Sequence, residues 1–361
     1  MRIVVAVLRG CLYASIPVLS YMTPHSLGQQ FVRLFLAVLL AVVVVHPIAA
    51  VGAQRMIVNA LEYPWSAIGR VNLGGRGHCT GFLVSERHVL TAAHCLYDVI
   101  EGRWRAPLEL HFVAGYQRDQ YIIHSKVVDF ERSDRVPAGS PPNWKNWGSD
   151  WAILTLEQPI GRQAGWIGPY ALTLDALQRI KKREAFLLQA GYRQDRQHVM
   201  TASLGCELAG YFEKGNGLAH TCDIMSGDSG SPLLLYMDGA FFATGIHSLS
   251  LKNGDGMLAV VLSLAIFLPG GIHQADRSFA GAGIEWSTSQ APGGAGPASS
   301  QPIVTIDTLL YRLGYLKETG GVATIDRQAA IVAFEKRQGL KTTGEPNLAL
   351  LGQLIAADAA P

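Results

Sequence analysis

Short apolar runs separated by turn-forming residues fill the chain from about Ile57 to Ile266, and this pattern most narrows the folds open to it. The runs include FLVSERHVLTAAHC, DWAILTLEQPIG and FFATGIHSLS, which are rich in β-branched and aromatic residues. Many short strands with turn signals between them favour a β-sandwich or barrel over alternating βαβ units. We therefore expect a mainly β domain over residues 54–286.

The composition changes after this region. Residues 287–302 read STSQAPGGAGPASSQP, which offers too little apolar side chain to order itself and predicts a flexible linker. Beyond the linker, apolar residues recur at helical spacing, first from Ile306 to Leu313 and then around Phe334 and Leu351. The pattern predicts a separate three-helix domain over residues 303–361.

The N-terminal segment has the layout of an export signal. A basic residue precedes an apolar run from Leu34 to Val45, and small residues follow, with a cleavage site expected near Ala50 or Ala53. We assign residues 1–53 to a signal peptide, with Met22 as an alternative start. Because the run is shorter than the roughly 20 residues of a membrane-spanning helix, we expect no stable membrane span after cleavage. An uncleaved anchor is the weaker alternative.

Four cysteines remain once the signal is removed: Cys79, Cys95, Cys206 and Cys222. An even number suits an oxidising compartment, and three pairings are open. If neighbours in sequence pair, each bridge contributes about 3 kcal/mol on the chain-entropy model. Metal binding by the adjacent histidine–cysteine pairs is disfavoured because Cys-x-x-Cys spacing is missing. We expect neither a metal nor a cofactor.

Charge does not identify a partner. Thirty basic residues stand against 28 acidic ones, a net charge of +2 at pH 7, and neither sign forms a long block. The basic run RIKKRE at 179–184 is interpreted as a solvated face, and nucleic acid is not expected as a partner.

The stretch GDSGSP places Ser229 on a turn of small residues before an apolar run. A serine hydroxyl is a poor nucleophile at neutral pH unless a nearby base accepts its proton. TAAHC supplies His94 at the end of an apolar strand, and DWAIL begins with Asp150, whose carboxylate can hold the second imidazole nitrogen. Each residue alone suits a structural role, but together they predict a nucleophile, a base and an orienting acid.

These three motifs, in this order, resemble the trypsin-like and chymotrypsin-like serine peptidases. The resemblance implies two six-stranded antiparallel β-barrels with the active site between them. It makes His94 the general base, Asp150 the residue that orients it and Ser229 the nucleophile. The N–H groups of Gly227 and Ser229 would form the oxyanion hole.

The resemblance also bears on the cysteines and on maturation. We predict the bridge Cys79–Cys95, which the resemblance implies, and the bridge Cys206–Cys222. The stretch RMIVNALEYPW resembles the start of mature family members. Cleavage before Ile57 would free an amine to pair with Asp228, and the sequence leaves open whether maturation needs this cut.

Two cues to substrate preference conflict. Asp223 stands where trypsin carries the acid that selects Lys or Arg, although Met225 replaces a cysteine that anchors this pocket wall in the pancreatic enzymes. His247 stands where glutamate-specific bacterial relatives hold an acidic side chain, and Ser248 follows it. We expect a basic P1 side chain bound by Asp223, with His247 and Ser248 as the alternative determinants.

The C-terminal segments LLYRLGYL, AAIVAFEKRQGL and TGEPNLALLGQL resemble the three-helix peptidoglycan-binding module of bacterial cell-wall proteins, with TGGVATID in place of the usual Asp-Gly loop. We therefore predict a secreted or periplasmic bacterial serine endopeptidase that this module attaches to peptidoglycan. The alternatives are a catalytically silent wall-binding protein and an endopeptidase that cuts peptidoglycan stem peptides. The helices alone also suit a helical cap or protein-docking module.

Overall fold

The computed structural model describes residues 55–143, 145–172, 174–212, 217–253, 256–264 and 302–358, which belong to one compact unit. The predicted signal peptide lies outside the described residues, and so do the end of the predicted peptidase domain and nearly all of the predicted linker. Within the described ranges, no helix is both long enough and apolar enough to cross a membrane.

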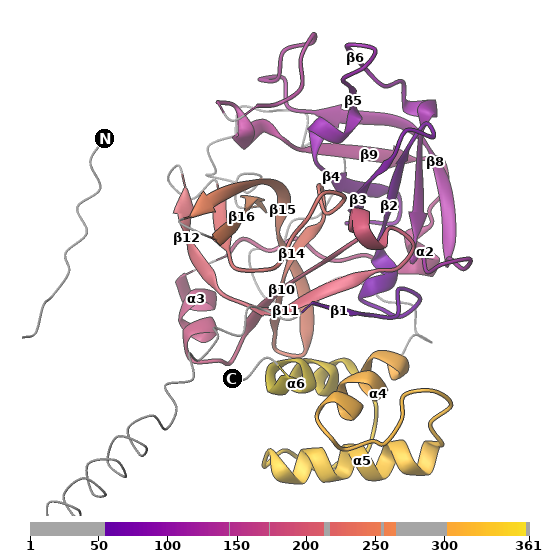
Figure 1. Cartoon of the computed structure of the whole chain (residues 1–361), viewed down its shortest axis with the longest axis vertical. Coiled ribbons are helices and arrows are strands. Elements are labelled where there is room, and N and C mark those ends of the chain that lie inside the picture. The colour runs from indigo at the N-terminus through magenta and orange to yellow at the C-terminus, as the bar shows by residue number, and fades with distance from the viewer. Residues whose placement is uncertain are drawn as a thin grey trace, which may run out of the picture. The chain divides into compact units, whose positions relative to one another are not determined.

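Six strands close into a barrel with the order β2-β3-β4-β9-β8-β7 (Figure 1). They are β2 (Ile68–Leu73), β3 (His78–Leu83), β4 (His88–Thr91), β7 (Leu110–Ala114), β8 (Ile123–Arg132) and β9 (Ala152–Leu156). Inward and outward side chains alternate, as in β7, where Leu110, Phe112 and Ala114 are buried. Gly69 is needed for this packing, because a Cβ there would lie 2.5 Å from the Phe112 ring.

Eight further strands form one sheet with the order β1-β11-β10-β14-β15-β16-β13-β12. They are β1 (Arg55–Ile57), β10 (Phe186–Gly191), β11 (Thr201–Cys206), β12 (Leu208–Phe212), β13 (Gly217–His220), β14 (Pro232–Met237), β15 (Ala240–Asn253) and β16 (Gly256–Ser263). Their pairings are antiparallel.

The second β structure differs from the predicted six-stranded barrel. Within the described residues it is an eight-stranded sheet that ends in β1 and β12. Strand β15 is 14 residues long and pairs with β14 and then with β16. Its register against β16 shifts between His247 and Leu249, a bulge that bends the strand. The motif FFATGIHSLS indicated this strand, but not how far it would continue.

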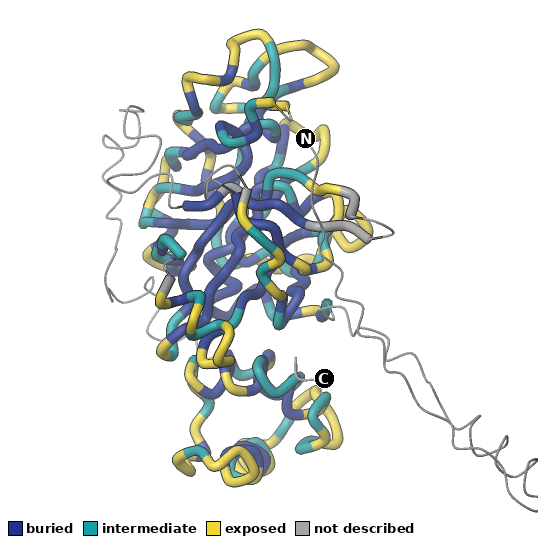
Figure 2. Tube along the Cα trace, turned by 90° about the vertical axis from the view of Figure 1, so that its left-hand side faces the viewer, coloured by how far each residue is buried: buried dark blue, intermediate teal, exposed yellow. Residues whose placement is uncertain are grey.

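Shorter elements connect these strands. They are the hairpin β5 (Tyr97–Asp98) and β6 (Arg103–Trp104), the 3₁₀ turns η1 (Trp65–Ala67), η2 (Ala93–Leu96), η3 (Pro107–Glu109), η4 (Trp147–Ser149) and η5 (Gln194–Arg196), and the helices α2 (Gly161–Ala164) and α3 (Leu174–Lys181). Figure 2 shows buried residues along the inner parts of the trace and exposed residues in the connecting loops.

The three predicted C-terminal helices are present as α4 (Ile303–Arg312), α5 (Thr324–Arg337) and α6 (Leu348–Asp358). Their buried apolar residues belong to the same hydrophobic cluster as Trp65 and Tyr236 of the β region. The buried Glu62 carboxylate accepts hydrogen bonds from the N–H groups of Val304 and Thr305, at 2.6 Å and 3.1 Å. The helices therefore share a core with the β domain, in addition to the covalent connection.

Candidate active site

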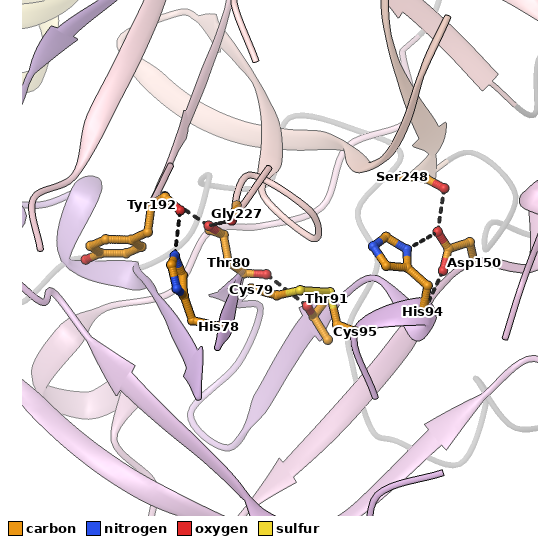
Figure 3. The surroundings of a disulfide bond; sticks show 10 residues. All are labelled: His78, Cys79, Thr80, Thr91, His94, Cys95, Asp150, Tyr192, Gly227 and Ser248. Atoms are coloured by element: carbon orange, nitrogen blue, oxygen red, sulfur yellow. Dashed lines mark hydrogen bonds and ion pairs between the residues drawn. A yellow bond between two sulfur atoms is a disulfide. The ribbon is translucent and has the colours of Figure 1, made fainter. Parts of the chain in front are cut away.

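His94 and Asp150 meet at one end of the barrel. His94 lies in η2, which follows β4, and Asp150 lies two residues before β9, the strand paired with β4. The His94 ring Nδ1 lies 2.7 Å from Asp150 Oδ2, and the His94 backbone N–H donates to Asp150 Oδ1 over 2.8 Å (Figure 3). The pairing of β4 with β9 thus brings the ring to the carboxylate.

The Asp150 carboxylate is held from a second side. Ser248 of β15 donates its hydroxyl to Asp150 Oδ2 over 2.5 Å. Only 4% of the Asp150 side chain is exposed, against 31% of the His94 side chain. A carboxylate at Nδ1 favours the neutral tautomer that carries its proton there, which leaves Nε2 able to accept a proton.

The pair shifts both acid–base equilibria. Burial raises the pKa of Asp150, but the charge of His94 and the hydrogen bonds from His94 and Ser248 outweigh this effect, so the pKa lies below its usual range. Burial lowers the pKa of His94, but the Asp150 carboxylate outweighs it, so the pKa lies above 6.5. The imidazole is therefore a stronger base than a free histidine.

Ser229 lies on a turn that contacts both β structures. Thr80 of β3 donates its N–H to the Ser229 carbonyl over 2.9 Å and its hydroxyl to the Gly227 carbonyl over 2.8 Å. The Gly230 N–H donates to the carbonyl of His247 in β15 over 2.8 Å. The serine side chain is partly exposed. These bonds fix the turn against β3 and against β15, the strand that carries Ser248.

The two glycines around Ser229 are required by close contacts. Gly227 has φ +95°, and a Cβ there would lie 2.3 Å from the Tyr192 carbonyl oxygen. Gly230 has φ +80°, and a Cβ there would lie 2.2 Å from Thr80 O and Thr91 Oγ1. Only glycine fits both the left-handed backbone and the space.

Two backbone N–H groups of the serine turn have no acceptor within the described residues. In the described part of the chain, neither the Gly227 N–H nor the Ser229 N–H donates a hydrogen bond, whereas the N–H of Asp228 between them donates to the Met225 carbonyl over 3.0 Å. The described residues also contain no hydrogen bond between Ser229 Oγ and His94. Such bonds are often long before substrate binds and shorten in the complex.

Asp223 lies at the surface. Its side chain is 53% exposed and forms an ion pair with Arg193. The role of Asp223 in binding a basic P1 side chain stays a prediction, and a substrate would have to compete with Arg193 for this carboxylate.

Two buried histidines lie close together beside the site. His247 and His220 are 4% and 0% exposed, and their ring centroids are 6.4 Å apart. The Cys222 N–H donates to His220 Nδ1 over 3.2 Å, so the Nε2 of His220 carries the proton. That Nε2 and His247 Nδ1 are both buried and have no hydrogen-bond partner among the described residues.

His220 was not singled out from the sequence. It lies in β13, and β16 separates β13 from β15, the strand of His247. Nothing in the local motif around His220 indicates this neighbour, since the contact depends on the order of three strands. Ser248, predicted to contact substrate, instead directs its hydroxyl at Asp150.

Both predicted disulfides are confirmed. Cys79 and Cys95 are bridged with an S–S distance of 2.05 Å, and Cys206 and Cys222 with one of 2.01 Å. The first bridge lies beside His94, and the second lies directly before Asp223. The thiols next to His94 are thus committed to a bridge and not to metal ligation.

Comparison with known proteins finds serine peptidases that are similar to part of this chain. The family model described as Trypsin matches residues 57–183, a range that includes His94 and Asp150 and ends before Ser229. A glutamyl endopeptidase of Bacillus licheniformis is 28% identical over 128 residues, which are 34% of this chain and 36% of that protein. Serine protease 23 of Mus musculus is 29% identical over 196 residues, 49% of this chain and 47% of that protein.

The solved structure of a Glu endopeptidase in complex with MPD is similar to 58% of this chain and 90% of its own chain, at 20% identity and a TM-score of 0.45. The chain spans less than two thirds of the length of the two curated relatives.

Proposed function

The family model described as Trypsin matches residues 57–183, and from that similarity we propose that this chain is an extracytoplasmic serine endopeptidase of the trypsin family. In this proposal Ser229 attacks the scissile carbonyl, His94 accepts the serine proton and Asp150 orients the imidazole. The proton then passes from His94 to the leaving amine, and water hydrolyses the acyl-enzyme by the reverse proton movements. The two disulfides support a location outside the cytoplasm.

The observation that carries the proposal is that an oriented histidine base and two backbone N–H donors without acceptors occur together among the described residues. His94 Nδ1 is fixed on a buried carboxylate, and the N–H groups of Gly227 and Ser229 lack acceptors within the described residues. Such donors stabilise the oxyanion of the tetrahedral intermediate, and the loss of one costs about 3 kcal/mol in the transition state.

The test uses a fluorophosphonate probe and a casein assay on the purified protein. We expect Ser229→Ala to abolish labelling and cleavage while the melting temperature changes little, because the hydroxyl makes no hydrogen bond within the described residues. Ser226→Ala, an exposed serine of the same loop, serves as the matched control and should keep its activity. Full cleavage by Ser229→Ala would refute the assignment, and absence of labelling in the unaltered protein would favour the silent wall-binding alternative.

We propose a glutamate or aspartate at the substrate's P1 position, in place of the basic residue expected from the sequence. Arg193 already neutralises Asp223, whereas His247 and His220 offer buried nitrogens without partners. Burial lowers the pKa of both histidines, that of His220 to about 3, so they are neutral and the P1 carboxylate meets N–H donors. The name of the Bacillus relative, a glutamyl endopeptidase, also supports this preference.

Fluorogenic peptides that differ only at P1 decide this point. We expect cleavage after Glu, a loss of that preference in His247→Ala, and no change of preference in Asp223→Ser. Cleavage after Arg that depends on Asp223 would restore the basic assignment.

Wall attachment through α4–α6 remains a separate proposal that rests on the resemblance of these helices alone. Because the helices share a core with the β domain, the test uses the full chain, which is expected to co-sediment with isolated cell walls. If a chain without the helices still co-sediments with cell walls, wall binding belongs to the β domain and not to α4–α6. Purified murein assayed beside casein distinguishes stem-peptide cleavage from protein cleavage.

A further inference from the structure

A buried cation lies next to the serine turn. Asp228, the neighbour of Ser229, has a fully buried side chain, and its Oδ1 lies 2.7 Å from Arg55 Nη2. Only 6% of the Arg55 side chain is exposed. Burial raises the pKa of the Asp228 carboxyl, and the charge of Arg55 opposes that rise. Each charge depends on the other, because a buried unpaired charge is strongly destabilising.

Arg55 is held by partners from distant parts of the chain. Its Nε donates to Thr201 Oγ1 over 2.6 Å, and its Nη1 donates to Gln189 Oε1 over 2.7 Å and to the Asp223 carbonyl over 2.6 Å. All three nitrogens of the guanidinium group are therefore engaged. The forked group is fixed in one orientation, with Nη2 directed at Asp228.

The Asp228 carboxylate connects this cation to the reacting groups. Asp228 Oδ2 accepts the Met225 N–H over 3.0 Å, and the Asp228 carbonyl accepts the Ser231 N–H over 2.9 Å. These bonds hold the backbone on both sides of Ser229. They leave the N–H groups of Gly227 and Ser229, the proposed oxyanion donors, without an acceptor in the described part of the chain. Without a cation, the buried carboxylate would have to reach solvent or become protonated, and the turn would rearrange.

We propose that Arg55 is the positioning residue that holds Asp228, and through it the Gly227–Ser229 turn, in the catalytic arrangement. In this role Arg55 takes the place of a terminal amine freed by cleavage before Ile57. Ile57 lies in β1 opposite Thr201, with 41% of its surface exposed. Cleavage before Ile57 would detach Arg55, so the cut would remove the cation. The inference rests on the proposed peptidase function.

The first test follows maturation. The secreted chain is purified, its N-terminus is sequenced, and its active sites are titrated with the fluorophosphonate probe. We expect full activity in a chain whose bonds from Arg55 to Ile57 are intact, and inactivation when a protease site inserted before Ile57 is cut. An intact chain that stays inactive until cut before Ile57 would overturn the proposal.

The second test changes the cation. We expect Arg55→Met to lower kcat/KM at least 100-fold, and Arg55→Lys, which keeps a cation, to remain within about tenfold of the unaltered protein. In an Asp228→Asn background, Arg55→Met should cause little further loss, because both changes act through one pair. Activity of Arg55→Met equal to that of the unaltered protein would overturn the assignment.

A pH profile separates positioning from general support of the fold. Burial lowers the pKa of the Arg55 guanidinium, and the Asp228 carboxylate opposes this effect. A lysine ammonium starts from a lower reference pKa of about 10.4, and burial lowers it in the same way. As the pH rises, Arg55→Lys should therefore lose kcat reversibly at a lower alkaline pH than the unaltered protein does. This comparison decides the matter even if Arg55→Met fails to fold, since equal alkaline profiles would refute the positioning role.

A matched control lies in the helices. Arg327 forms a similarly shielded pair with Asp307, at 2.7 Å, and Arg327→Ala should lower the melting temperature without changing kcat. The two proposals fail in different ways. Activity in Ser229→Ala removes the proposed function, whereas a Ser229-dependent activity that ignores Arg55 removes only this inference.

Discussion

At the scale of single residues, we expect the raised pKa of His94 to set the pH range of the proposed peptidase activity. In the proposed mechanism His94 must be neutral to accept the serine proton, and Asp150 raises its pKa above 6.5. More than half of the rings are therefore protonated and inactive at pH 6.5, so kcat/KM should rise with pH and reach half its maximum above that value. The measurement is a pH–rate profile of the free enzyme with a fluorogenic peptide.

Asp150→Asn provides the contrast. Without the carboxylate, burial alone acts on the ring and lowers its pKa, so the acidic limb should move to lower pH, with kcat reduced by about 10⁴-fold. An unchanged limb in this variant would show that another group controls the profile.

The proposed catalytic residues His94, Asp150 and Ser229 can be predicted from the sequence because each lies in a short motif. The structure brings the first two into direct contact. Arg55 and His220 could not be found in this way. Their partners come from distant strands or loops. Arg55 and Asp228, for example, are separated by 173 positions in the sequence.

At the scale of elements, the serine turn depends on the absence of a side chain at position 230. Gly230→Ala would place a Cβ 2.2 Å from two oxygens of Thr80 and Thr91, with φ at +80°. We expect the variant to lose several kcal/mol of unfolding free energy, more than the roughly 1–2 kcal/mol of the left-handed backbone alone, together with its activity. Urea unfolding and the peptide assay measure both.

Gly75→Ala is the matched control for this change. Gly75 has φ +79°, but nothing lies within 4 Å of the Cβ that the substitution would add. It should therefore show only the backbone cost and keep its activity. Equal losses in the two variants would mean that contact with Thr80 and Thr91 is unimportant.

The elements themselves were predictable to different degrees. Alternating apolar residues indicated the strands, and the helical spacing around Phe334 indicated α5, because these patterns follow from local backbone geometry. The number of strands in the second β structure was not predictable, since it depends on how far β15 continues past its bulge at His247. Pairing across the sheet decides that length, and local pattern does not report it.

At the scale of the whole molecule, Glu62 connects the β domain to the helices. Its carboxylate accepts the N–H groups of Val304 and Thr305 and the Thr305 hydroxyl, which caps the first turn of α4 from outside the helix. We expect Glu62→Ala to lower the unfolding free energy by at least the 0.5–2 kcal/mol typical of a lost cap. Thermal unfolding should then show the helices melting before the β domain.

Glu345→Ala, an exposed acid in the loop before α6, is the control and should leave unfolding unchanged. A single transition in Glu62→Ala at the temperature of the unaltered protein would contradict a role for Glu62 in joining the two parts. The sequence suggested a module that is independent apart from its linker, because composition cannot reveal a carboxylate that lies 242 positions away from its partner.

The Arg55–Asp228 pair also bears on when the proposed peptidase becomes active in the cell that produces it. If the Arg55 side chain supplies the cation, no cleavage is needed to activate the folded protein. We then expect the proposed peptidase to be active as soon as it has folded. In the proposed extracytoplasmic location, we expect the two disulfides to form only outside the reducing interior, so that the active fold is completed there. Cleavage at varying positions before Arg55 should therefore leave activity unchanged, and fusion tags at the N-terminal end should be tolerated.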